Sequence, residues 1–217
     1  MLESLDVERM LRCQCLFGGG TAIVLAHGEY RESLDVDFIV SSVAGYRELR
    51  SLVNAEGIAA LMKRPLPLRR EARIDQYGIR CALDVGGVAI KFEVVFEGRV
   101  ALADPLPEQR IAGVWTLRRE DQVATKLMAN SDRWADASVC CRDIIDLAML
   151  AEGGAADPAG VAKAVAAYGD SVFTDVDKAR ARLLEHEGRL ASCMARLQMT
   201  MAEEELRAKL AGLVVER

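Results

Sequence analysis

The chain has 217 residues, in which 28 Lys and Arg stand against 33 Asp and Glu, so the formal net charge is −5. Hydrophobic residues make up 51% and charged residues 28%, a globular composition that excludes a disordered chain. Aromatic residues are only 5%, so a base-stacking surface of several rings is not expected. The negative net charge also excludes a wholly basic nucleic-acid coat protein.

The sequence predicts a cytoplasmic protein without a membrane segment. No apolar run approaches the length of about 18 residues that a membrane span needs. The first six residues carry acids where a signal peptide needs positive charge. The six cysteines include no Cys-x-x-Cys pair and the histidines number two. Free, buried thiols are therefore expected, rather than a zinc site of the usual spacing.

The first half of the chain has the pattern of a mixed α/β unit. Its pattern predicts a helix, a short apolar run, a buried helix, a strand, a helix and a set of antiparallel strands, at residues 2–14, 15–17, 22–26, 34–40, 44–55 and 70–97. Turn signals at 77–78 and 86–87 divide the last segment. In the strand 34–40, Val36, Phe38 and Val40 share one face, whereas Asp35 and Asp37 share the other.

The second half has helical spacing throughout. Helices are expected at residues 119–131, 138–151, 158–168, 174–195 and 200–215. The predicted fold class is therefore α+β, with an N-terminal mixed-sheet domain at residues 1–118 and a C-terminal helical bundle at residues 119–217.

A glycine run is the first candidate for a functional site. Gly18, Gly19, Gly20 and Thr21 lie between an expected strand and an expected helix. Backbone N–H groups at a helix N-terminus, together with the helix dipole, suit a phosphate. No Gly-Lys-Ser/Thr follows, so this is not a P-loop, and the glycine spacing is not that of a Rossmann fold. The alternative is a tight turn with no ligand.

Carboxylates on strands are the second candidate. Asp35 and Asp37 point at the same volume, and a divalent cation with oxygen ligands would neutralise them. Glu93 lies on the polar face of the strand around residues 88–96, and it completes a group of three if that strand neighbours 34–40. Asp84 and Asp75 compete with Glu93 for this role. The alternatives are a solvated strand edge for the aspartates and a cross-strand ion pair for Glu93.

Charged residues of the helical half form the third candidate. Lys126 lies in one expected helix, and Asp143 and Asp146 share a face of the next. Taken alone, they read as a solvated face or as an ion pair between helices.

The order of these motifs resembles the AbiEii/AbiGii toxin branch of the DNA polymerase β-like nucleotidyltransferase superfamily. The resemblance covers about residues 15–150, and Tyr30 departs from it, because the family usually has His at that position. The matching motifs are Gly19-Gly20-Thr21-Ala22, Arg31-Glu32-Ser33-Leu34-Asp35-Val36-Asp37-Phe38, Ile90-Lys91-Phe92-Glu93, Lys126 and Arg142-Asp143-Ile144-Ile145-Asp146-Leu147.

The resemblance implies a role for each candidate residue. Asp35, Asp37 and Glu93 would hold two divalent cations, taken to be Mg²⁺, and Glu93 would also assist deprotonation of the acceptor. Gly19, Gly20 and Thr21 would cradle the triphosphate of the substrate NTP. Arg31 and Ser33 would support either the phosphates or the loop. Lys126 would neutralise the triphosphate, and Asp143 would be an active-site carboxylate or would orient Lys126.

The resemblance also implies an enzyme that transfers NMP from an NTP to an acceptor, as a toxin neutralised by a separately encoded antitoxin. RNA such as tRNA is the expected acceptor. Residues 47–73 carry seven basic residues against three acidic ones and could bind RNA phosphates, or they could be an ordinary solvated surface. The alternatives are modification of a small molecule or a protein, and a degenerate family member that binds nucleotide without turnover.

Overall fold

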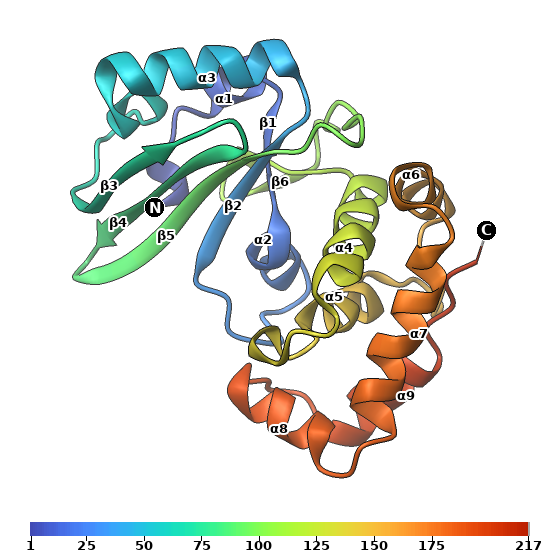
Figure 1. Cartoon of the computed structure of the whole chain (residues 1–217). Helices are drawn as coiled ribbons and strands as arrows, with labels where there is room; N and C mark the ends of the chain where they lie inside the picture. The colour runs from blue at the N-terminus through green and yellow to red at the C-terminus, as the bar shows by residue number, and fades with distance from the viewer. Residues whose placement is uncertain (217) are drawn as a thin grey trace. The chain divides into compact units, whose positions relative to one another are not determined.

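The computed structural model describes residues 1–216, which form helices and strands along the whole range (Figure 1). The strands are β1 (Cys15–Gly18), β2 (Asp35–Val40), β3 (Leu68–Ile74), β4 (Gly78–Val85), β5 (Val88–Phe96), β6 (Arg110–Ile111) and β7 (Val114–Trp115). The α-helices are α1 (Val7–Arg12), α2 (Gly19–Ala26), α3 (Val43–Glu56), α4 (Arg119–Arg133), α5 (Arg142–Leu150), α6 (Pro158–Tyr168), α7 (Ser171–Leu184), α8 (Arg189–Arg196) and α9 (Glu203–Ala211). Short 3-10 turns are η1 (Leu2–Ser4), η2 (Ile58–Leu61) and η3 (Ala137–Val139).

The chain divides into two compact units. The first consists of Met1–Ala22 and Leu34–Arg118 and contains the sheet. The second consists of Ile23–Ser33 and the chain from Arg119 onward, and it is helical. The α+β fold class expected from the sequence is confirmed.

The sheet of the first unit has five strands in the order β1-β2-β5-β4-β3. β2 and β5 are parallel neighbours, whereas the other pairs are antiparallel. The crossover from β2 to β5 contains α3 and the hairpin strands β3 and β4. This order places the two carboxylate-bearing strands side by side at the centre of the sheet.

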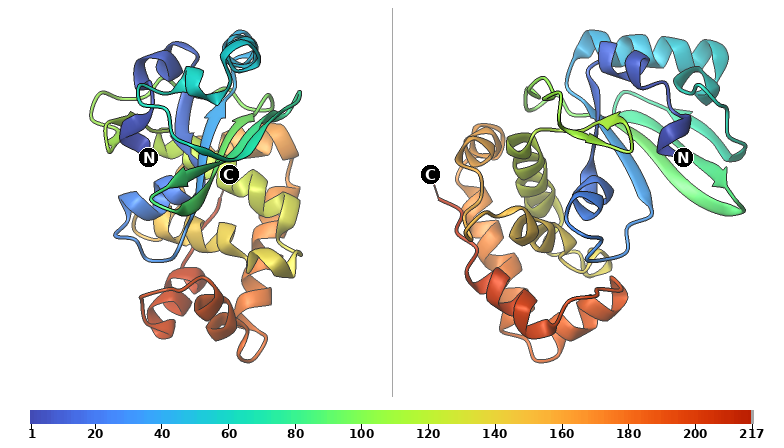
Figure 2. Two further views of the ribbon diagram at one scale, coloured as in Figure 1. Left: turned by 90° about the vertical axis from the view of Figure 1, so that its left-hand side faces the viewer. Right: turned by 180° about the vertical axis from the view of Figure 1, so that it is seen from behind.

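Period-two alternation decides which face of each strand is buried. Val36, Phe38 and Val40 of β2 and Phe92 and Val94 of β5 are buried in one apolar cluster. Residues from α1, α3 and η2 complete this cluster, so these elements cover one face of the sheet. Figures 1 and 2 show α3 lying along that face. The charged residues of β2, β4 and β5 therefore share the opposite face.

The helices of the second unit differ from the expected ones at three places, of which the simplest is that the helix expected over 200–215 is the shorter α9 (Glu203–Ala211). The helix expected over 174–195 is two helices, α7 and α8, and Gly188 between them adopts φ +67°, a left-handed conformation that a continuous α-helix does not contain. The helix expected over 138–151 begins only at Arg142. Cys140 and Cys141 before it both have positive φ, so the backbone cannot continue as a helix there. No helix within residues 1–216 has the length and apolar character that crossing a membrane requires.

Candidate functional site

The glycine turn joins β1 to α2 and lies against Asp37. Gly19 has φ +69°, and a Cβ added there would lie 2.5 Å from Oδ2 of Asp37, so glycine is the residue that fits. Gly20 follows in the first turn of α2, half-buried. The Thr21 hydroxyl is buried and donates to the backbone carbonyl of Asp35. The turn is thus anchored to the first residue of β2 and touches the third.

Asp35, Asp37 and Glu93 lie on one face of neighbouring strands. In the parallel pairing of β2 with β5, Asp37 is directly opposite Glu93, and Asp35 is opposite Lys91. Adjacent strands are about 4.8 Å apart. Gly18, the last residue of β1, is opposite Asp37 on the other side. The three carboxylates and the glycine turn therefore belong to one local arrangement of the first unit.

The side chain of Glu93 forms ion pairs with two basic residues of the same face. Lys91 Nζ lies 2.9 Å from its Oε2, and Arg80 Nε lies 3.2 Å from its Oε1. Among residues 1–216, no three His, Cys, Asp or Glu side chains gather closely enough to form a metal-ligand set. The carboxylates thus share a face and a register, but they do not converge.

The donor chemistry nevertheless fits a hard divalent cation. Carboxylate oxygens are the ligands that Mg²⁺ takes in proteins. Among the described residues, Asp35 has neither a hydrogen bond nor an ion pair through its carboxylate. Asp37 faces the space that a side chain on Gly19 would fill. Two aspartates so placed can hold a cation, with Glu93 as the third candidate ligand.

The two competing carboxylates have other partners. Asp75 accepts hydrogen bonds from the backbone N–H groups of Tyr77 and Gly78, and it pairs with Arg80. These contacts, led by the Tyr77 N–H, lower the pKa of Asp75. Asp84 accepts from the N–H of Gly87 and pairs with Arg69 at 2.6 Å. Each of these aspartates closes a hairpin turn, whereas Glu93 lies in register with Asp37.

The remaining candidates belong to a buried ion-pair network in the helical unit. Lys126 of α4 lies between two carboxylates of α5, with its Nζ 3.0 Å from Asp143 Oδ1 and 2.6 Å from Asp146 Oδ2. Arg133 of α4 binds both oxygens of Asp143, at 2.6 and 2.9 Å. Lys126 and both aspartates are almost fully buried. Of the two roles that the sequence left open for Asp143, its contacts correspond to the orientation of Lys126.

Asp146 also binds the segment that precedes β2. Arg31 donates to both of its oxygens, at 2.8 and 2.9 Å, and the Tyr30 hydroxyl donates at 2.6 Å. Tyr30 therefore makes a side-chain hydrogen bond at the position where the family usually has His. Arg31 is buried, so its contacts match support of the loop rather than of phosphates. Ser33 is half-buried at the end of this segment.

The network keeps both aspartates ionised. Burial is the largest single effect and raises the pKa of both Asp143 and Asp146, but the surrounding cations together outweigh it, and Lys126 contributes most among them. Arg133 adds to this effect at Asp143, and Arg31 adds to it at Asp146, so both pKa values are lowered. Three cations and two anions leave the group with one net positive charge.

Two cations of these sites were missed in the sequence analysis. Arg80 pairs with Glu93 from the neighbouring strand, and the alternation of β4 could have indicated that it faces away from the core. Arg133 lies seven residues after Lys126, which is two helical turns and therefore the same face of α4. The sequence shows the face on which each arginine lies, but it does not show that Arg80 pairs with Glu93 or that Arg133 pairs with Asp143.

The basic segment 47–73 does not form one surface. Arg47 and Arg50 lie on α3, which covers the apolar face of the sheet, and Arg50 stacks on Tyr46 of the same helix. Arg70 and Arg73 of β3 are in register with Ala82 and Arg80, on the open face. Only the β3 part of the segment thus shares a face with the three carboxylates.

Comparison with known proteins gives a family and two structural neighbours. The family model described as nucleotidyl transferase AbiEii toxin, type IV TA system, matches residues 2–213. No curated protein matches. A Helicobacter pylori protein described as a nucleotidyltransferase is 15% identical, with a TM-score of 0.47 over 94% of this chain and 86% of its own. The Helicobacter pylori protein JHP933 is 16% identical, with a TM-score of 0.46 over 94% of this chain and 83% of its own.

Proposed function

The chain belongs to the AbiEii nucleotidyltransferase toxin family, and on this premise we propose that it transfers a nucleoside monophosphate from an NTP to an RNA acceptor such as tRNA. In this proposal it acts as the toxin of a toxin–antitoxin pair, in the cytoplasm, and a separately encoded protein neutralises it. We propose that residues 1–118 are the catalytic domain and residues 119–217 the helical domain, with the difference that Ile23–Ser33 belong to the helical unit of the structure.

One observation carries the proposal most directly. Asp37 is in register with Glu93 on the neighbouring parallel strand, and the glycine turn lies against the Asp37 carboxylate. A phosphate-binding turn beside paired carboxylates is the arrangement that metal-assisted phosphoryl transfer needs. This placement supports a nucleotide site at the β1–α2 junction.

In this proposal, each candidate residue of the first unit has a role. Asp35, Asp37 and Glu93 would hold two divalent cations, which would supply charge neutralisation for phosphoryl transfer. The N–H groups at the start of α2, from Gly19 to Thr21, bind the triphosphate. The buried Thr21 hydroxyl holds the Asp35 carbonyl and keeps the turn in place. Glu93 would also assist deprotonation of the acceptor hydroxyl.

The ion-pair network of the helical unit fixes the orientation of its cations. Lys126 and Arg133 are fixed by Asp143, and Arg31 is fixed by Asp146, so the cations keep one orientation. A preorganised cation stabilises developing charge more strongly than a mobile one, because it needs no reorganisation during the reaction. The Lys126 ammonium is itself buried against Asp143 and Asp146, so we propose that Lys126 neutralises the triphosphate through the net positive charge of its network. We also propose that Ser33 supports the loop leading to the metal-binding aspartates.

Incubation with each labelled NTP, Mg²⁺ and total RNA tests the function. We expect label to move into an RNA species, and we expect Asp37→Asn to lower this transfer by about 10²–10³-fold or more. Growth arrest on expression should disappear with the same variant. Transfer of label to a small molecule or a protein would overturn the RNA acceptor, and nucleotide binding without transfer would overturn the enzyme.

A further inference from the structure

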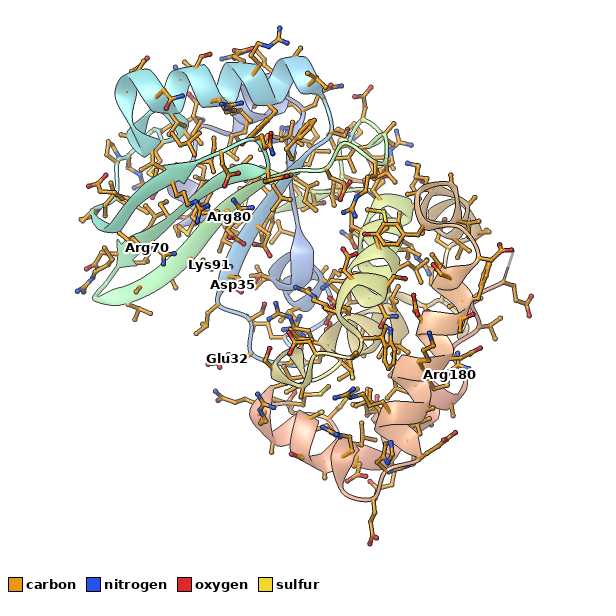
Figure 3. The ribbon with its side chains drawn as sticks, in the orientation of Figure 1. Glu32, Asp35, Arg70, Arg80, Lys91 and Arg180 are labelled. Atoms are coloured by element: carbon orange, nitrogen blue, oxygen red, sulfur yellow. The ribbon has the colours of Figure 1, made fainter. Side chains whose placement is uncertain are left out.

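Two rows of charged side chains cross the open face of the sheet. In the first, Asp37 of β2 is followed by Glu93 of β5, Arg80 of β4 and Arg73 of β3, each in register with the next. The second row runs in the same direction through Asp35, Lys91, Ala82 and Arg70. Figure 3 shows Asp35, Lys91, Arg80 and Arg70 on these strands. Both rows change from acidic at β2 to basic at β3.

Glu93 lies at the point where the charge changes sign. Each of its oxygens has one cation, Lys91 on Oε2 and Arg80 on Oε1. The Glu93 side chain is 14% exposed, whereas those of Arg80 and Lys91 are 31% and 43% exposed. The cations can therefore contact a ligand from solvent without any change in the backbone.

From this geometry we propose that Arg80 and Lys91 exchange partners. They hold Glu93 while no divalent cation is bound, and they bind backbone phosphates of a polynucleotide acceptor once a divalent cation takes the Glu93 carboxylate. The inference rests on the proposed function, because it needs Glu93 as a metal ligand. Arg80 and Lys91, which have no role in the proposed reaction so far, would then bind the acceptor.

The order of the strands indicates that the phosphates bound by Arg80 and Lys91 belong to the acceptor and not to the NTP. The glycine turn follows β1, on one side of β2, and the four cations lie on β5, β4 and β3, on the other side. In an in-line displacement the attacking and leaving groups lie on opposite sides of the reacting phosphorus. The carboxylates lie between the glycine turn, which would bind the triphosphate, and the basic residues. The basic residues are thus on the acceptor side.

The row is also long enough for more than one phosphate. Beyond Arg80 and Lys91, the Arg73 side chain is 81% exposed, and Arg70 is exposed as well. Arg73 faces Arg80 directly across the strands, a like-charge pair that costs free energy unless an anion lies close by. Asp75 provides part of the compensating negative charge, because it pairs with both arginines. A chain of phosphates, rather than one small acceptor, matches cations on three neighbouring strands.

The exchange predicts effects of opposite sign on the two ligands. Lys91 and Arg80 compete with a divalent cation for Glu93, so removing either one should tighten metal binding. The same change should weaken RNA binding, because one phosphate contact is lost. By linkage, metal and RNA must each increase the affinity of the protein for the other. A purely structural ion pair predicts neither the opposite signs nor the coupling.

Titration of the full chain with Mn²⁺ alone, without nucleotide, tests the first effect. We expect Lys91→Gln and Arg80→Gln to bind Mn²⁺ about two- to five-fold more tightly than the unmodified protein. Arg70→Gln removes a charge from the same face without touching Glu93, so it should leave Mn²⁺ affinity unchanged. Arg47→Gln, on α3, is the control for charge removal elsewhere. Unchanged or weaker Mn²⁺ binding in both exchange variants would overturn the inference.

Binding of a fluorescein-labelled single-stranded RNA, with and without Mn²⁺, tests the second effect. With Mn²⁺, Lys91→Gln and Arg80→Gln should each reduce the salt dependence of log K by about 0.7. Without Mn²⁺ they should change it little, because Glu93 then occupies both cations. Equal losses with and without Mn²⁺ would overturn the exchange, and so would RNA binding that no variant on this face weakens.

Asp37→Asn separates failure of this inference from failure of the proposed function. If the unmodified protein binds Mn²⁺ and Asp37→Asn does not, the metal site exists, and the exchange variants judge the inference alone. If neither protein binds Mn²⁺, the metal site of the proposed function fails, and the exchange fails with it.

Discussion

Gly19 is the residue at which the end of β1 turns into α2, and its conformation bears directly on Asp37. Its φ of +69° lies in the left-handed region, which costs other L-residues about 1–2 kcal/mol. A side chain there would also have to displace the Asp37 carboxylate. The glycine motif therefore serves two purposes, a tight turn and an open space beside a candidate metal ligand.

Gly19→Ala should therefore damage the site more than the fold. We expect a loss of stability of about 1–2 kcal/mol from the backbone, measured by urea unfolding. We expect Mn²⁺ affinity to fall by about tenfold or more, because the displaced Asp37 is no longer oriented. Gly28→Ala is the matched control: its φ is +76°, and no atom lies within 4 Å of the added Cβ. Equal metal affinity in the two variants would contradict this account.

Among the elements, α5 concentrates charge in the helical unit. Its Asp143 and Asp146 lie three residues apart on one helix face, and between them they bind Lys126 and Arg133 of α4 and Tyr30 and Arg31 of the segment before β2. A buried ion pair adds little net stability when it is complete, but the loss of one partner leaves an uncompensated charge. The free energy of unfolding should therefore depend strongly on Asp146.

Asp146→Asn should destabilise the protein by about 3–5 kcal/mol, since Arg31 and Lys126 lose a buried counter-charge. Tyr30→Phe should cost less, about 1–2 kcal/mol, because it removes one of several donors. Tyr30→His, with the residue usual in the family, should recover part of that loss if the ring nitrogen reaches Asp146. Urea unfolding measures all three variants. An Asp146→Asn protein as stable as the unmodified one would contradict the role of the network.

The same element predicts a dependence of stability on pH. The pKa values of Asp143 and Asp146 are lowered in the folded protein, so their contribution is complete above the unfolded value of about 3.9. It is lost as the pH falls below about 4 toward the folded values. Asp146→Asn should therefore flatten the fall in unfolding free energy between about pH 5 and pH 2. A parallel fall in the variant and the unmodified protein would argue against this source.

At the scale of the whole molecule, the six cysteines are divided between the two units and can be used to follow the unfolding of each one. All six are free and buried, as the sequence predicted. Cys13, Cys15 and Cys81 belong to the first unit, and Cys140, Cys141 and Cys193 belong to the second. Burial also raises the pKa of Cys13, Cys81 and Cys193 to about 11, which keeps these thiols protonated and unreactive at neutral pH.

Pulsed alkylation with iodoacetamide over a urea series, read by mass spectrometry, should therefore find little labelling of the folded protein. As urea rises, cysteines of the same unit should become reactive together, because each unit opens as one cooperative structure. The two groups need not open at the same urea concentration. Cysteines of one unit that become reactive at clearly different concentrations would contradict the division into two units.

The sequence by itself determined which faces of the central strands are charged. In residues 34–40 and 88–96, apolar and charged side chains alternate, and a strand has only two faces, so burial of one exposes the other. The positive φ that a turn at the glycine run demands was also readable, because few residues other than glycine tolerate it. Local rules of this kind need no knowledge of distant residues.

The partners were decided only by the tertiary structure. Whether Glu93, Asp84 or Asp75 lies beside Asp37 depends on the register of β2 with β5, and that register arises from packing across a long crossover. In the same way, Lys126 could have met Asp143 or solvent, and Arg31 could have met a phosphate or Asp146. A charged side chain accepts any opposite charge within reach, so its partner is set by which elements the folded chain brings together.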